Sequence, residues 1–171
     1  LMRLGLSGIM EEIDRYDSIT PEHSSRKKDF YRACRIIING ISDWMKMYAD
    51  HAEHLADEAE GEWHDQLLEI AENCRAASWK VPETLREAGQ LMWAFCLWDW
   101  VDCIGRFDQY MYPYYKEDLD SGNLTREFAQ ELMDCIWVKL NDLNKCRDAA
   151  SAEGFAGYSL FQNLIAGGQN E

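Results

Sequence analysis

Residues 105–115 read Gly-Arg-Phe-Asp-Gln-Tyr-Met-Tyr-Pro-Tyr-Tyr, directly after the most apolar part of the chain. This stretch sets an arginine, an acid and an amide close together among five aromatic side chains. Charged groups in apolar surroundings must be paired or must serve a cavity, because burying an unpaired charge is costly. Arg106 and Asp108 therefore form either a structural ion pair or part of a pocket.

The segment before this stretch is predicted to be a buried helix. It runs from Pro82, which suits a first helical turn, to about Cys103, and Gly105 ends the pattern. Its side chains are apolar nearly all round, which is typical of a helix enclosed within a larger protein.

The rest of the chain also reads as helical. We expect helices over residues 4–16, from the low twenties to about 60, from 62 to the mid-seventies and over 125–150. Thr20, Pro21 and Glu22 are interpreted as the start of the long second helix. Residues 158–166 alternate weakly before two glycines and are predicted to form a strand.

The long second helix is predicted to bury one apolar stripe. Its members alternate steps of four and three residues: Phe30, Cys34, Ile37, Ile41, Trp44 and Tyr48. Gly40 interrupts this run, which indicates a weak point or another element packed closely against it.

Composition narrows the classes of function. The 171 residues carry a net charge of −14, so nucleic acid and anionic membrane surfaces are unexpected partners. No run is long and apolar enough to cross a membrane, and no signal peptide is recognisable, so we expect a cytoplasmic protein. Both ends of the sequence suggest an internal piece of a larger protein.

Candidate metal and thiol sites are weak. His51 and His54 lie three apart near Glu53, but that segment is polar over most of its surface, so a solvated face is preferred to a metal site. The six cysteines form no CxxC pair and are expected to be mostly buried free thiols. We therefore predict no metal ion and no bound cofactor in this chain.

Residues 105–115 resemble the glycyl radical enzyme signature Gly-Arg-x-Asp-Gln-Tyr-(Met/Leu)-Tyr-Pro-Tyr-Tyr. The likeness extends to Lys116-Glu-Asp-Leu119 and Gly122-Asn-Leu-Thr125 downstream, and to Glu69-Ile-Ala-Glu-Asn-Cys-Arg75 and Glu87-Ala-Gly-Gln90 upstream. Residues 162–169 are similar to the family's barrel-strand segment. The resemblance, to the pyruvate formate-lyase and glycerol dehydratase type of large subunit, covers nearly the whole chain.

The resemblance implies the fold. Family members are α/β barrels of ten strands, two five-stranded halves wrapped in helices. Residues 1–171 would be a mainly α fragment of the catalytic domain, with at most one or two strands. The catalytic cysteine loop and the radical glycine would lie beyond Glu171, so no catalytic residue is expected here. Gly157 lacks the preceding arginine of the radical loop and is not assigned to it.

The resemblance also implies the chemistry. A thiyl radical removes a hydrogen atom from a small polar substrate, and a C–O, C–N, C–C or C–S bond then breaks. A separate iron–sulfur activase that uses S-adenosylmethionine installs the glycyl radical, and we expect the full-length lyase or dehydratase of anaerobic metabolism to be a homodimer. The alternative is a non-catalytic helical scaffold or binding module that kept the family's shape.

Three positions are expected to bind the substrate because they match pocket positions of similar enzymes: Cys103, Asp108 and Gln109. Dehydratase-like members often carry serine where this chain has Cys103, and decarboxylase-like members often carry an aromatic residue where it has Gln109. An acid beside an amide suits a small hydroxylated substrate. These departures leave the substrate and the bond open.

Overall fold

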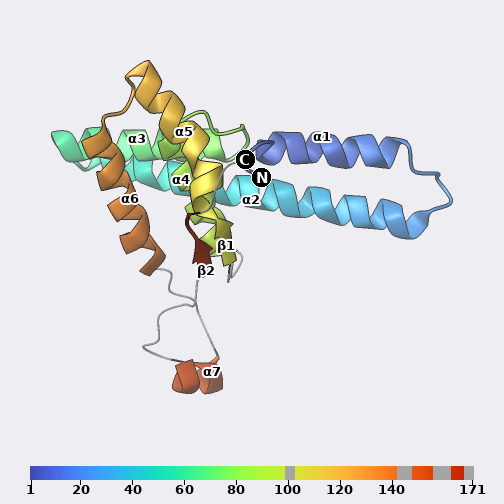
Figure 1. The fold of residues 1–171 in the computed structure, drawn as a ribbon. Helices are drawn as coiled ribbons and strands as arrows, with labels where there is room; N and C mark the ends of the chain where they lie inside the picture. Colours follow the sequence, from blue (N-terminus) through green and yellow to red (C-terminus); the bar gives the residue numbers. More distant parts are fainter. Residues whose placement is uncertain (99–102, 142–147, 156–162, 168–171) are drawn as a thin grey trace. The chain divides into compact units, whose positions relative to one another are not determined.

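The computed structural model describes residues 1–98, 103–141, 148–155 and 163–167 (Figure 1). Within these ranges the chain is mainly helical, with seven helices and two short strands, which confirms the predicted fold class. It divides into two compact units, Leu1–Leu91 and Met92–Glu171, and each is described by itself. In the described part of the chain, no helix combines the length and apolarity that crossing a bilayer requires.

The first unit is built on one long helix. Helix α2 (Ser25–Asp57) packs against α1 (Gly5–Ser18) along its N-terminal half and against α3 (Glu62–Ala77) along its C-terminal half (Figure 1). Arg75 on α3 supports the second contact, because its guanidinium bonds the carboxylates of Asp50 and Glu53 on α2.

Small side chains form the contact between α2 and α3. Ala49 and Ala52 of α2 meet Ala71 and Cys74 of α3 in one buried cluster, which Ile70 flanks. Small residues let two helix backbones approach closely and fill the space between them without voids. Small side chains therefore form the centre of this contact, and Ile70 packs against its edge.

The predicted apolar stripe on the long helix is wrong. Ile41 is buried, but Phe30, Ile37 and Tyr48 are 63%, 48% and 43% exposed. The buried face is offset from that stripe and includes small and polar members: Ile38, Ile41, Ser42, Met45, Ala49, Ala52 and Ala56. The spacing of the largest residues misled the prediction because α1 and α3 contact α2 through this other face.

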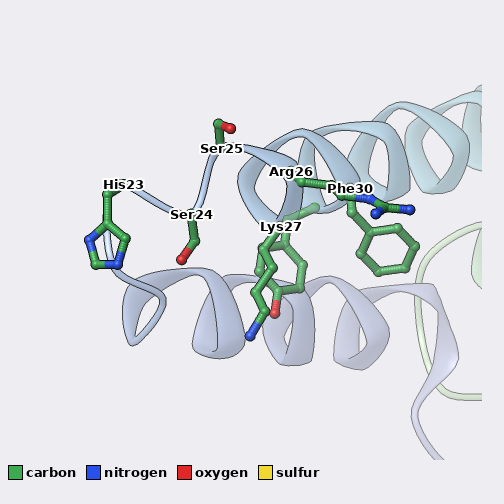
Figure 2. A pocket seen from close by; sticks show the side chains of 7 residues that line it. His23, Ser24, Ser25, Arg26, Lys27 and Phe30 are labelled. Carbon is green, nitrogen blue, oxygen red and sulfur yellow. The ribbon is translucent and has the colours of Figure 1, made fainter.

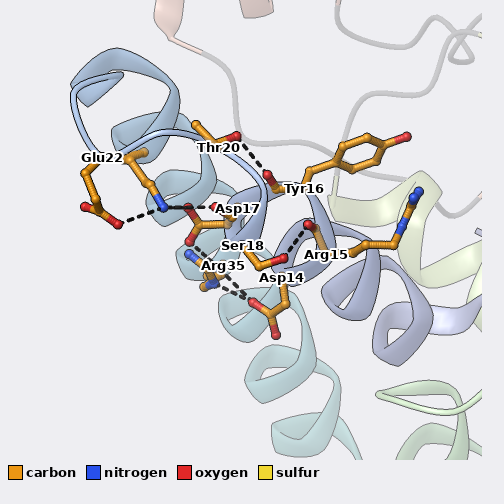
Figure 3. Close-up of polar contacts among 9 residues, drawn as sticks. Asp14, Arg15, Tyr16, Asp17, Ser18, Thr20, Glu22 and Arg35 are labelled. Atoms are coloured by element: carbon orange, nitrogen blue, oxygen red, sulfur yellow. Dashed lines mark hydrogen bonds and ion pairs between the residues drawn. The ribbon is translucent and has the colours of Figure 1, made fainter.

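Ion pairs fasten α1 to the start of α2 (Figure 3). Asp17 lies between two cations of α2: Lys28 Nζ is 2.9 Å from its Oδ1, and Arg35 Nη2 is 2.7 Å from its Oδ2. Arg35 also bonds Asp14, one turn earlier on α1. Hydrogen bonds from Lys28 and Arg35 lower the pKa of the Asp17 carboxyl.

Two helices begin later in the sequence than predicted. Pro21 does not begin α2, because the Ser24 N–H donates to the Pro21 carbonyl in a turn and the helix begins at Ser25. Thr20 instead lies just after the end of α1, where its hydroxyl donates to the Tyr16 carbonyl. Likewise α4 (Leu85–Trp98) begins after Thr84 and not at Pro82.

Thr84 and Glu87 cap the start of α4. The Glu87 N–H donates to the Thr84 hydroxyl at 3.1 Å, and the Glu87 carboxylate accepts from the Glu83 N–H at 2.7 Å. This arrangement resembles a capping box, in which two unpaired amides are satisfied at once. As predicted, the helix is heavily buried, with Leu85, Ala88 and Leu91 almost inaccessible to solvent.

The second unit contains the two strands and the later helices. Its complete elements are β1 (Cys103–Arg106), α5 (Phe107–Ser121), α6 (Arg126–Asn141), α7 (Ala149–Phe155) and β2 (Asn163–Ile165). Thr125 caps α6 as predicted, since its hydroxyl accepts from the Phe128 N–H. The helix predicted over 125–150 is thus α6 and the start of α7, with 142–147 outside the described residues. The predicted strand 158–166 overlaps β2 at residues 163–165, and its residues 158–162 lie outside the described ones.

Candidate functional site

The stretch from Gly105 to Tyr115 turns directly from strand to helix. Strand β1 ends at Arg106 and α5 begins at Phe107, with no loop between them. One expectation is corrected here: the helix over 82–103 does not extend to Cys103, because Cys103 begins β1. The short aromatic segment 106–115 comprises the last residue of β1 and the first turns of α5. Pro113 lies inside α5 and has no N–H to donate to the Gln109 carbonyl, four residues earlier.

Strands β1 and β2 pair in parallel. Arg106 is opposite Ile165, Gly105 is opposite Leu164, and the register shifts between Cys103 and Gly105. Gly105 has φ of +75°, a left-handed conformation that glycine adopts without strain. Because the strands are parallel, the residues that follow them meet at one edge, the carboxyl edge of the pair.

Apolar anchors orient the start of α5. Phe107 and Met111 lie one turn apart and are buried, and the Phe107 ring packs 5.3 Å from the Trp137 ring of α6. Residues between these anchors lie on other sides of the helix. Asp108 is accordingly half-buried and Gln109 exposed.

Asp108 uses both carboxylate oxygens. Its Oδ1 accepts from the Gln109 N–H at 2.9 Å, in the first turn of α5. Its Oδ2 accepts from the Gly167 N–H at 2.7 Å, just beyond β2. A carboxylate has about four acceptor positions, and these two contacts between described residues occupy two of them.

Arg106 contacts Gln109 and not Asp108, the partner considered from the sequence. Its Nη1 lies 3.4 Å from Gln109 Oε1, and none of the ion pairs between described residues joins Arg106 to Asp108. The Arg106–Asp108 pair considered from the sequence is therefore not formed in this structure. Because a guanidinium can only donate, the Gln109 amide oxygen faces Arg106. The Gln109 NH₂ group then points away from Arg106.

Cys103 is the first residue of β1 and pairs in register with Asn163. The strand therefore brings Cys103, Asp108 and Gln109 to one short region, from the start of β1 to the first turn of α5. Sequence reasoning missed Gly167, whose amide completes the Asp108 contacts. The only signal for it was the pair of glycines after the predicted strand.

This edge offers hydrogen-bonding groups of both kinds. Asp108 supplies a carboxylate acceptor, and Gln109 supplies an amide that can donate and accept. Hydroxyl groups both donate and accept, so an acid beside an amide is suited to hold a hydroxylated molecule.

The histidines show no metal site. His51 and His54 are exposed, and the neighbouring Glu53 carboxylate is engaged by Arg75. Throughout the described residues, no three His, Cys, Asp or Glu side chains gather closely enough to hold a metal ion.

Cys74 is buried between α2 and α3. Burial raises the pKa of its thiol to about 11, so the thiol stays protonated at neutral pH and acts as a small apolar side chain.

A hollow of about 620 Å³ lies at the start of α2, lined by residues 23–27, Phe30 and Tyr31 (Figure 2). Its lining carries two cations, Arg26 and Lys27, and no carboxylate. It contains none of the site residues expected from the sequence.

Comparison with known proteins connects these features to one family. A family model described as pyruvate formate lyase-like matches residues 1–171. The chain is 33% identical to the probable dehydratase YbiW of Escherichia coli K12, over 99% of this chain and 22% of that protein. It is 30% identical to the (2S)-3-sulfopropanediol dehydratase of Klebsiella oxytoca, over 94% of this chain and 21% of that protein.

Solved structures are similar as well. A structure described as 1,2-propanediol dehydration in Roseburia inulinivorans matches with a TM-score of 0.85 and 44% identity, over 98% of this chain and 21% of that one. The glycerol-bound B12-independent glycerol dehydratase of Clostridium butyricum matches with a TM-score of 0.82 and 37% identity, over 99% and 22%. The chain thus spans about a fifth of the length of these relatives.

Proposed function

Because the chain belongs to the pyruvate formate lyase-like family, we propose that it is part of a glycyl radical dehydratase acting on a small vicinal diol. Such an enzyme breaks a C–O bond, so that a 1,2-diol loses water and becomes an aldehyde or ketone. The thiyl and glycyl radicals would be carried outside residues 1–171. A radical-activating enzyme would install the radical, and the full-length protein would act as a homodimer.

The observation that carries this proposal is the identity to diol dehydratases. The chain is 44% and 37% identical to the structures described for 1,2-propanediol and glycerol dehydration. It is 27% identical to the isethionate sulfite-lyase of Desulfovibrio desulfuricans. The two identities to solved diol dehydratases support C–O cleavage of a diol.

The carboxyl edge of the β1–β2 pair supports the proposal. Cys103, Asp108 and Gln109 would line the substrate site, with the Gln109 amide NH₂ donating to a substrate hydroxyl. Arg106 would hold that amide in place through its contact with Gln109 Oε1. Hydroxyl groups can donate to the Asp108 carboxylate and accept from the Gln109 amide, so both groups can bind a diol.

The test uses the full-length protein, activated without oxygen. We expect turnover of 1,2-propanediol or glycerol and no release of sulfite from isethionate. Gln109→Ala should raise KM by roughly 3- to 10-fold, the loss of one hydrogen bond, while the radical yield stays unchanged. Gln130→Ala is the matched control, because Gln130 is exposed on α6 and bonds Asp134.

Two results would count against the proposal. Activated enzyme that converts isethionate but no diol would replace dehydration with C–S cleavage. A full-length protein that acquires no glycyl radical under conditions that activate a known dehydratase would favour the helical scaffold alternative.

A further inference from the structure

The two parallel strands are tied together beyond their ends by one side chain. Arg106 and Ile165 are opposite each other in register, and Asp108 and Gly167 each lie two residues further along. The Gly167 N–H donates to Asp108 Oδ2 at 2.7 Å, across 59 residues of sequence. The other oxygen of the same carboxylate accepts from the Gln109 N–H.

Both partners are suited to this contact. Asp108 lies in the first turn of α5, where the helix dipole and unpaired amides favour a negative charge. Gly167 has φ of +94°, which side chains rarely tolerate, so glycine is what lets this backbone direct its N–H at the carboxylate. Hydrogen bonds from amides to an ionised carboxylate are also stronger than those between neutral groups.

We propose that Asp108 is a positioning residue that fastens the segment after β2, at Gly167, to the first turn of α5. The proposal rests on the proposed function, since the segment held in this way borders the edge that would receive the diol. Asp108 then acts on binding mainly through the Gly167 backbone, while Gln109 donates directly to the substrate. Loss of the hydrogen bond between Asp108 and the Gly167 amide should therefore have two effects: the amide becomes free, and the diol binds more weakly.

The first measurement is hydrogen exchange on the full-length enzyme, unactivated and without substrate. Asp108→Ala removes both carboxylate oxygens, so the bonds from the Gly167 and Gln109 amides are both lost. We expect the Gly167 amide to exchange at least roughly tenfold faster than in the wild type. Glu117→Gln is the control for loss of one negative charge on α5, and it should exchange like the wild type.

The second measurement is calorimetry of glycerol binding to the same unactivated proteins. We expect Asp108→Ala to bind glycerol roughly tenfold more weakly, and Asp108→Glu, which keeps the carboxylate, to recover part of the affinity and part of the protection at Gly167. Unchanged exchange at Gly167 in Asp108→Ala would overturn the proposal, even with weak binding, because the Gly167 amide would then not depend on the Asp108 carboxylate. Faster exchange with wild-type affinity would overturn it too.

Failure of the proposed function has a different signature. Wild-type enzyme that binds no glycerol and no 1,2-propanediol would contradict the proposed diol site, and the positioning role would fall with it. Exchange at Gly167 is measured without substrate and without the radical. It therefore reports on the hydrogen bond between Asp108 and Gly167 whether or not the enzyme binds a diol.

Discussion

Gly5 lies directly against the backbone of Lys80. A Cβ built on Gly5 would be 2.6 Å from the Lys80 carbonyl carbon and 2.7 Å from the Val81 nitrogen, closer than real side chains approach. Gly5 also has φ of +62° and begins α1, while the nearby Ser7 N–H donates to the Trp79 carbonyl. The start of the first helix and the segment after α3 therefore meet backbone to backbone.

We expect Gly5→Ala to destabilise the chain by about 2–4 kcal/mol. A left-handed backbone strains any residue with a Cβ, and the added methyl must push the Lys80 backbone away. Urea unfolding followed by circular dichroism measures the loss. Gly122→Ala separates the two causes, because Gly122 has φ of +77° but open space around a Cβ, so it should cost less.

Asp17 predicts a dependence of stability on pH. Hydrogen bonds from Lys28 and then Arg35 lower its pKa from the ordinary value, so the charged form stabilises the folded state. This contribution is complete above about 4, the pKa of an unfolded aspartate, and disappears as the pH falls through the lower folded pKa. Asp17→Asn should therefore lower the melting temperature at pH 7.

The same variant should match the wild type in melting temperature once the pH is below both pKa values. Asp29→Asn is the control, because Asp29 is well exposed and its pair with Arg32 spans 3.7 Å. That variant should change little at any pH. A difference between Asp17→Asn and the wild type that persisted in acid would show that packing, and not charge, explains the effect.

Much of the fold could be predicted from local patterns. Apolar periodicity and turn residues located α1, α2, α3 and α6, because each of these signals acts within a few residues. The start of α4 was also present locally, as the pattern of Thr84 followed by Glu87, but Pro82 was taken as the stronger signal. Strand β1 could not be predicted in this way. Its four residues directly follow an apolar run that was predicted to be helical, and they form a strand because they pair with β2.

The candidate site also has one part that local sequence could suggest and one part that depends on strand pairing. The resemblance of residues 105–115 made Asp108 and Gln109 candidate site residues, and the structure places both in the first turn of α5, directly after β1. The Gly167 contact could not be predicted, because it depends on the parallel register that sets Arg106 opposite Ile165. The partner of Arg106 was missed for a related reason: the turn from strand into helix sets its guanidinium towards Gln109.

Cys74 should resist alkylation in the native protein. Its thiol is 3% exposed and its pKa is raised to about 11, so only roughly one thiol in a thousand is ionised at pH 8. Iodoacetamide labelling followed by peptide mass spectrometry should find Cys74 unmodified in native protein and modified in guanidinium chloride. Cys74 that labels equally fast in both would contradict the packing of α2 on α3.

Gly40→Ala should stabilise the 171-residue chain by about 0.5–1 kcal/mol. Gly40 lies within α2, where alanine is the better helix former, and a Cβ there would meet nothing within 4 Å. Ala33→Gly, at an exposed position of the same helix, is the reciprocal control and should cost a similar amount. Urea unfolding of both variants checks the pair. Loss of stability in Gly40→Ala would instead support the other interpretation of this glycine, an element packed too closely to admit a methyl group.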